Sequence, residues 1–150
     1  MRLALYEPDI PQNTGTLMRL CACLGVPMDI IEPCGFILSN KNLHRAGMDY
    51  IGHLALTRHL DWAAFRGAAA DKRLVLMTTK AGDSFLDFKF QTNDVLIAGR
   101  ESAGVPEGVR AGCAASVTIP MVPGLRSLNV ALASAIVLGE ALRQTKGYPA

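Results

Sequence analysis

The hydrophobic pattern of the chain alternates between short apolar runs and longer segments with helical periodicity. Residues 74–77 and 95–98 are apolar throughout, which is typical of strands buried on both faces of a parallel sheet. The predicted strands span residues 2–5, 28–31, 51–56, 74–78, 95–99 and 116–119. The predicted helices span residues 14–24, 41–46, 61–70 and 127–145, with Asp61 and Ser127 as expected N-caps. This alternation predicts one α/β domain over residues 1–150, with a mostly parallel sheet of about six strands and flanking helices.

The predicted C-terminal helix is apolar on nearly all sides. One stripe at i, i+3 and i+4 spacing consists of Leu128, Leu132, Ala135, Ile136, Gly139 and Leu142. A helix of this kind has to be buried on most of its surface. Burial in the core of its own domain would satisfy the pattern, and so would a position between that core and a second subunit. We favour the second arrangement and expect a homodimer.

Composition and charge narrow the function classes. Half of the residues are hydrophobic and 19% are charged, which excludes a disordered chain or a coiled coil. The formal net charge is only +2, so a nucleic-acid site would have to be a local patch of arginines.

No membrane, secretion or metal signal stands out in the sequence. The N-terminal residues have no signal-peptide core, and the longest apolar stretch, 128–138, is far shorter than the ~20 residues of a membrane span. We therefore expect a cytoplasmic protein without a membrane partner. Its four cysteines are then expected to be buried thiols, and its three histidines have no metal-ligand spacing, so we expect no metal.

Polar or glycine-rich segments follow several of the predicted strands. In the first, residues 7–19, Asn13 or Thr14 is expected to cap the next helix. Arg19 lies one to two turns inside that helix, either as a surface side chain or as a charge directed at an anion. A further segment, residues 76–82, also follows a predicted strand. Its Thr-Thr-Lys sequence could face the same ligand site as the other strand-end segments.

Two later loops complete this set. Gly99 and Gly104 frame a loop that contains Glu101, and the missing side chains allow its backbone to approach a ligand closely. The loop lacks the lysine of a phosphate-binding P-loop. Residues 119–129 form a proline-rich loop that enters the last helix through Ser127 and Asn129, which could bind a ligand or simply cap the helix.

Together these loops resemble the three signature motifs of the SPOUT-class RNA 2′-O-ribose methyltransferases. The first motif corresponds to Asn13-x-Gly15-x-x-x-Arg19, the second to residues 99–106, and the third to residues 119–121 with 126–129. The resemblance runs nearly end to end. It is greatest to the branch that methylates the wobble nucleotide, cytidine or uridine 34, of tRNA, although Ala131 and Gly139 replace a serine and an aromatic residue usual in that branch.

The resemblance implies a SPOUT fold with a C-terminal trefoil knot, a homodimer, and a tRNA anticodon stem-loop as substrate. It implies S-adenosyl-L-methionine as cofactor, leaving as S-adenosyl-L-homocysteine, with no metal. The implied cofactor-binding residues are Met77, Gly99, Ile119, Ser127 and Leu128. The implied catalytic residues are Arg19, Asn13, Glu101, Ser127 and Asn129.

The chemistry of methyl transfer constrains the role of Arg19. A ribose hydroxyl has to be aligned with the methyl group, and its proton has to leave. A guanidinium resists deprotonation, so we expect Arg19 to stabilise the developing alkoxide and a nearby phosphate rather than act as a base.

Two alternatives to a wobble methyltransferase stay open at this stage. The first is methylation of ribosomal RNA or of another tRNA position, and the second is a catalytically silent RNA-binding dimer. A wobble methyltransferase without a separate RNA-binding domain would take its tRNA on the dimer surface, where the expected basic patch consists of Arg19, Arg45, Arg58, Arg100 and Arg126.

Overall fold

The computed structural model describes residues 1–39, 48–80 and 83–150, and in them six strands form one sheet. The strands are β1 (Arg2–Tyr6), β2 (Met28–Ile31), β3 (Leu56–His59), β4 (Arg73–Met77), β5 (Asp94–Ala98) and β6 (Ala115–Val117). Their order is β3-β2-β1-β5-β4-β6, and each pairing is parallel. The prediction of a parallel six-stranded α/β domain is confirmed, while the trefoil knot stays a prediction.

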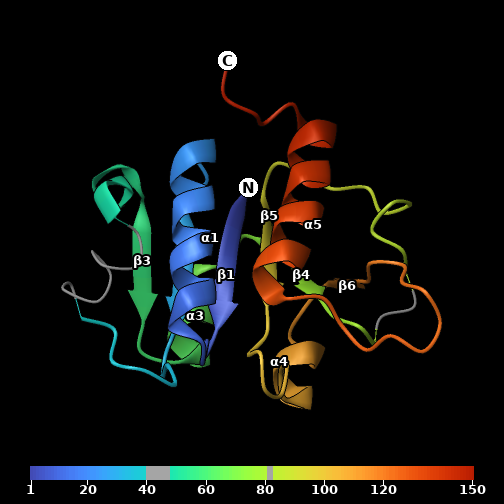
Figure 1. Cartoon of the computed structure of the whole chain (residues 1–150), viewed down its shortest axis with the longest axis horizontal. Helices are drawn as coiled ribbons and strands as arrows, with labels where there is room; N and C mark the ends of the chain where they lie inside the picture. Colours follow the sequence, from blue (N-terminus) through green and yellow to red (C-terminus); the bar gives the residue numbers. More distant parts are fainter. Residues whose placement is uncertain (40–47, 81–82) are drawn as a thin grey trace.

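Helices cover both faces of the sheet (Figure 1). The helices are α1 (Pro11–Leu24), the short 3-10 helix η1 (Met48–His53), α3 (Trp62–Ala68), α4 (Glu107–Ala111) and α5 (Val130–Thr145). Side chains of α1 and α5 pack in one buried cluster with β1, β2 and β5. Phe65 of α3 and Val109 of α4 pack on the opposite face, against β4 and β5. Alternate residues of β1, β2, β4 and β5 thus enter two separate cores, as the continuous apolar runs indicate.

The strand order reverses direction between β1 and β5. From β1 the chain proceeds to β2 and β3 on one side, and β5, β4 and β6 lie on the other. Parallel α/β sheets bind ligands in the crevice outside the carboxyl ends of their strands at such a switch point. The loops that follow β1 and β5 leave the sheet at this place.

One predicted strand is misplaced. Residues 51–56 do not form a strand, because residues 48–53 form η1 and the strand begins only at Leu56. This strand lies at the sheet edge, and its residues Thr57 and Arg58 are exposed, so no apolar run marks it. The helix expected at residues 41–46 lies outside the described residues.

The starts of α1 and α5 also differ from the prediction. Pro11 occupies the first turn of α1 and Ile10 precedes it without a side-chain cap, so neither Asn13 nor Thr14 caps the helix. Asn129, and not Ser127, caps α5, whereas the prediction of Asp61 as the N-cap of α3 is confirmed. The short helix α4 was not predicted, since a single apolar residue, Val109, anchors it.

Candidate active site

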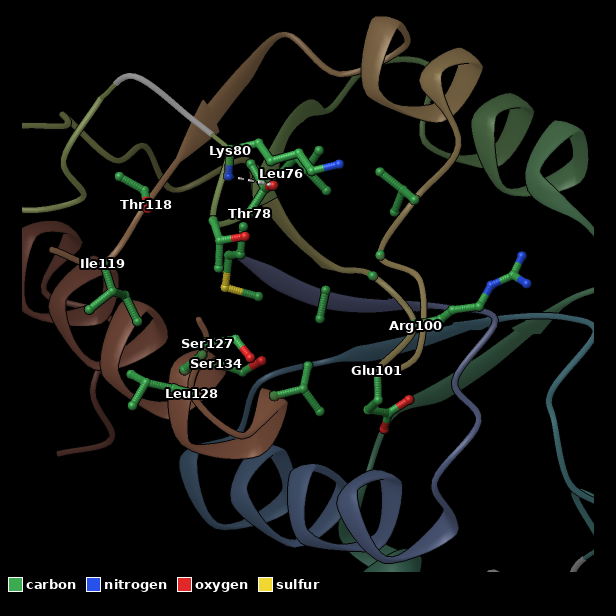
Figure 2. A pocket seen from close by; sticks show the side chains of 18 of the residues that line it. Leu76, Thr78, Lys80, Arg100, Glu101, Thr118, Ile119, Ser127, Leu128 and Ser134 are labelled. Carbon is green, nitrogen blue, oxygen red and sulfur yellow. Dashed lines mark hydrogen bonds between the residues drawn. The ribbon is translucent and has the colours of Figure 1, made fainter. Parts of the chain in front are cut away.

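A cavity of about 710 Å³ opens at the carboxyl ends of β4, β5 and β6. Its walls come from the loop after each of these strands and from the first two turns of α5 (Figure 2). All five residues that the resemblance implies for the cofactor lie in this wall: Met77, Gly99, Ile119, Ser127 and Leu128. Their convergence agrees with the expected pocket, although their binding role stays a prediction.

The segment that follows β4 reaches the same cavity. Thr78, Thr79 and Lys80 contribute to the wall, as the sequence indicated. The carbonyl of Lys80 accepts a hydrogen bond of 3.1 Å from the guanidinium of Arg110, which also lies at the cavity. This contact links the exit of β4 to α4 and was not anticipated, because the two residues are 30 positions apart.

A hydrogen-bond chain connects the three predicted loops. The side-chain amide of Asn129 donates to Oδ1 of Asn13 at 2.9 Å, and the amide of Asn13 donates to Oε1 of Glu101 at 3.1 Å. Oδ1 of Asn129 also accepts from the backbone N–H groups of Ala131 and Leu132. Asn129 therefore caps α5 and ties it to α1 at the same time. The capping role is confirmed for Asn129, and ligand binding by Ser127 and Asn129 stays a prediction.

Glu101 is held from a second direction by Asp9. The backbone N–H of Asp9 donates to Oε2 of Glu101 at 2.9 Å, and the N–H of Glu101 donates to Oδ1 of Asp9 at 3.2 Å. The hydroxyl of Ser102 also bonds to the Asp9 carboxylate. Hydrogen bonding from the Glu101 carboxyl and from Ser102 lowers the pKa of Asp9 to about 2, while burial raises the pKa of Glu101. These hydrogen bonds tie the loop after β5 to residues 9–13, and the catalytic role of Glu101 stays a prediction.

Gly99 allows the loop after β5 to fold back on itself. A Cβ atom at Gly99 would lie 2.8 Å from the carbonyl carbon of Gly104 and 3.0 Å from Cγ1 of Val105. Gly104 itself has φ of +67°, a conformation that glycine adopts without strain. The N–H groups of Arg100 and Gly104 bond to each other's carbonyls and close the turn.

Arg19 lies apart from the cavity within its own chain. It is not among the wall residues, and it is exposed on α1 with its guanidinium 4.8 Å from the centre of the Tyr50 ring. This stacking contact between Arg19 and Tyr50 of η1 was not predicted from the sequence. The structure brings Asn13, Glu101, Ser127 and Asn129 to the cavity but leaves Arg19 outside it.

The expected arginine patch is only partly available. Arg58 pairs with Glu32, and Arg100 pairs with Glu7, next to Tyr6. Figure 2 shows Arg100 directed away from the centre of the cavity. Arg45 lies outside the described residues. Arg19 and Arg126 are exposed and form no ion pair with the described parts of the chain, and Arg126 lies at the cavity.

Residues 1–39, 48–80 and 83–150 contain no candidate metal site and no candidate membrane-spanning helix. These residues contain no group of three His, Cys, Asp or Glu side chains placed to hold a metal ion. Nor does any helix among them have the length and hydropathy required to cross a membrane. The absence of a metal cofactor stays a prediction.

The fold and the cavity define an α/β protein with its ligand site at the carboxyl ends of the strands. The chain matches the model of the SpoU rRNA Methylase family over residues 1–139, and it belongs to this family. A curated relative from Beijerinckia indica is a tRNA (cytidine(34)-2′-O)-methyltransferase. It is 58% identical over 144 residues, which cover 95% of this chain and 90% of the relative.

Two solved structures share the fold. One, described as giving structural insights into the 2-OH methylation of C/U34 on tRNA, has a TM-score of 0.91 and 41% identity, covering 97% of this chain and 96% of that one. The other is the SpoU methyltransferase AviRb from Streptomyces viridochromogenes in complex with the cofactor AdoMet. It has a TM-score of 0.80 and 28% identity, covering 96% of this chain and 60% of that one.

Proposed function

We propose that this protein transfers a methyl group from S-adenosyl-L-methionine to the ribose 2′-hydroxyl of nucleotide 34 in tRNA. One structural observation carries the proposal. Three segments that are far apart in sequence, the first turn of α1, the loop after β5 and the start of α5, are joined by the Asn129–Asn13–Glu101 chain at the edge of one cavity. The names of the relatives, at up to 58% identity over nearly the whole chain, support the choice of tRNA and of position 34.

The cavity fits a ligand of this type. Its volume of about 710 Å³ lies within the range of roughly 300–1,000 Å³ that is usual for cofactor sites. Apolar side chains of β5, β6 and α5 line its inner part, and charged groups such as Lys80 and Glu107 lie elsewhere along its wall. Such a cavity suits an amphiphilic molecule with a nucleoside and a charged amino-acid half. When bound, S-adenosyl-L-methionine supplies an electrophilic methyl group and leaves as S-adenosyl-L-homocysteine.

The chain's own residues have to align the hydroxyl and stabilise its negative charge. We assign Met77, Gly99, Ile119, Ser127 and Leu128 to the cofactor. Asn13 and Asn129 hold the loops in place, and Glu101 anchors the loop after β5. Arg19 stabilises charge on the 2′-oxygen, and the proton leaves toward a phosphate or water.

The position of Arg19 outside the cavity of its own chain favours a homodimer as the active unit. Leu128, Leu132 and Ile136 form an exposed apolar stripe on α5 and at its start, beside the cavity. Burying this stripe against a second copy would bring another protein surface to the cavity mouth. We infer that Arg19 of one copy serves the cavity of the other, and that the pair binds the anticodon stem-loop across both copies. A cytoplasmic location follows from this substrate.

Mass spectrometry of tRNA nucleosides tests the proposed reaction. Purified protein with labelled S-adenosyl-L-methionine should add 2′-O-methyl groups to tRNA isolated from a strain that lacks the gene. Nuclease mapping of the product should then place the methyl group at position 34. The same product at another tRNA position or in ribosomal RNA would support methylation of a different substrate. No label in any RNA would leave only an RNA-binding role.

Subunit mixing tests the role of Arg19. Arg19→Ala should abolish turnover and leave S-adenosyl-L-homocysteine affinity nearly unchanged. Co-expressed with Gly99→Ala, whose cavity loop is distorted, it should regain turnover, because a mixed pair retains one intact cavity facing an intact Arg19. Mixed pairs that stay inactive would contradict an arrangement across two subunits.

A further inference from the structure

Ser134 contributes a buried hydroxyl group to the cavity that nothing in the described protein satisfies. The residue is fully buried at 0% exposure, and its Oγ has no hydrogen-bond partner. Leaving a hydroxyl in this state costs free energy, so buried hydroxyls almost always have a partner. The two buried and unpartnered side-chain atoms in the described residues are this Oγ and Nε of Arg100, and Arg100 donates from its Nη2 to Glu7.

The usual local partner of a helical hydroxyl is not used by Ser134. Serine and threonine inside helices commonly bond to the carbonyl one turn earlier. Thr145, on the same helix, does so with the carbonyl of Ala141 at 2.8 Å, and Thr16 on α1 does so with Gln12 at 2.9 Å. Ser134 makes no such bond. Figure 2 shows its side chain directed into the cavity.

The surroundings of Ser134 indicate the type of group that it would bind. The wall residues one turn before and after it on α5, Val130 and Val137, are apolar, and the cavity wall also includes the buried apolar residues Ala98 of β5 and Val117 of β6. A carboxylate or ammonium group placed here would lose its hydration without a charged partner. A neutral group that both donates and accepts hydrogen bonds matches a single hydroxyl among apolar side chains.

We propose that the Ser134 hydroxyl hydrogen-bonds the nucleoside half of S-adenosyl-L-methionine. The inference rests on the proposed function, because it assumes that this cofactor occupies the cavity. Ser134 is then a cofactor-binding residue in addition to the five that the sequence motifs imply. The charged amino-acid half of the cofactor lies away from Ser134, toward the polar part of the wall.

Calorimetric binding of S-adenosyl-L-homocysteine to wild-type protein and to Ser134→Ala tests the contact. The variant should bind about 3- to 10-fold more weakly, as expected for one hydrogen bond to a neutral group. The melting temperature of the ligand-free variant should be unchanged or higher, because its hydroxyl has no partner to lose. Thr145→Ala, which removes a hydroxyl from the same helix outside the cavity, should leave the affinity unchanged.

A second ligand distinguishes the two halves of the cofactor. 5′-Methylthioadenosine lacks the amino-acid portion, so Ser134→Ala should weaken its binding by the same factor. If only S-adenosyl-L-homocysteine were affected, the contact would be to the amino-acid half and the inference would be wrong. Equal affinities of wild type and variant, or a fall in the ligand-free melting temperature alone, would also overturn it.

A crystal structure of the wild-type complex gives an independent measure. The Ser134 Oγ should lie within hydrogen-bond distance, about 2.7–3.2 Å, of a nitrogen or oxygen of the nucleoside. A complex in which this oxygen faces only carbon atoms would overturn the inference and leave the proposed function intact. A wild-type protein that binds neither ligand would refute the proposed cofactor itself.

Discussion

Two substitutions of Asn129 should distinguish its role as the cap of α5 from its link to Asn13. Its Oδ1 caps α5 through hydrogen bonds of 2.8 Å and 3.3 Å, and its Nδ2 links α5 to Asn13 at 2.9 Å. Asn129→Ala removes both. Loss of an N-cap costs about 0.5–2 kcal/mol, and the exposed link adds roughly 0.5 kcal/mol at the lower end of the range for a hydrogen bond. The free energy of unfolding should therefore fall by about 1–2.5 kcal/mol.

Asn129→Ser provides the matched comparison. Serine caps a helix about as well as asparagine, but its short side chain does not reach Asn13. This variant should lose only about 0.5 kcal/mol. Asn13→Ala breaks the same link from the other side, so the double variant Asn13→Ala/Asn129→Ser should lose less than the sum of the two single losses.

Urea denaturation at one fixed protein concentration measures these differences, since association would otherwise change the apparent stability. If Asn129→Ser is as unstable as Asn129→Ala, the cap does not account for the loss. If the double variant shows strictly additive losses, the bond between Asn13 and Asn129 carries no coupling. Either result would refute the structural reasoning.

Three further predictions concern the loop glycine, the thiols and the acidic pair. Gly99→Ala should destabilise the protein by about 1–3 kcal/mol in urea titrations, because the new Cβ would overlap the backbone of Gly104. Gly67→Ala in α3 is the control: a Cβ there meets nothing within 4 Å, so the variant should be neutral or more stable by up to about 1 kcal/mol. Equal effects of the two substitutions would contradict the tight packing of the loop after β5. Ellman's reagent at pH 8 should react rapidly with one thiol, that of the exposed Cys23. The other thiols should react slowly, because burial raises the pKa of Cys21 to about 12 and the pKa of Cys34 and Cys113 to about 11. A Cys23→Ser variant that still contains a rapidly reacting thiol would disprove this prediction. Because the pKa of Asp9 is lowered to about 2, its carboxylate should stabilise the fold above pH 3.8 and lose this effect as the pH falls toward 2. Asp9→Asn should therefore lower the free energy of unfolding at pH 6 and lower it progressively less toward pH 2. A difference in the free energy of unfolding that does not change with pH would count against the lowered pKa.

Several features could be predicted from the sequence because they depend on neighbouring residues. Continuous apolar runs indicated β4 and β5, since a strand between two helix layers needs apolar side chains on both faces. Asp61 was recognisable as a helix cap because its carboxylate accepts from an N–H only three residues away. The edge strand β3 was misplaced for the converse reason, as half of it faces solvent and its pattern is weak.

Arginine roles depended on the tertiary structure. Arg58 and Arg100 were candidates for RNA contact, but Glu32 and Glu7 pair with them in the fold. Arg100 and its partner Glu7 are 93 positions apart, and no local pattern signals such a pair. The unpartnered hydroxyl of Ser134 was likewise invisible, because a lone serine in an apolar helix normally bonds to its own backbone.

The sequence by itself determined the α/β class, the strand-end loops and the residue types that they present. Only the tertiary structure decided which of these residues meet, because Asn13 and Asn129 are 116 positions apart and are joined only when α1 and α5 pack on the same face of the sheet. Helix periods, strand alternation and caps follow from interactions within a few residues, which can be recognised along the chain. Contacts between distant segments follow from the order of the strands and from the burial of both cores, and these are properties of the folded chain as a whole.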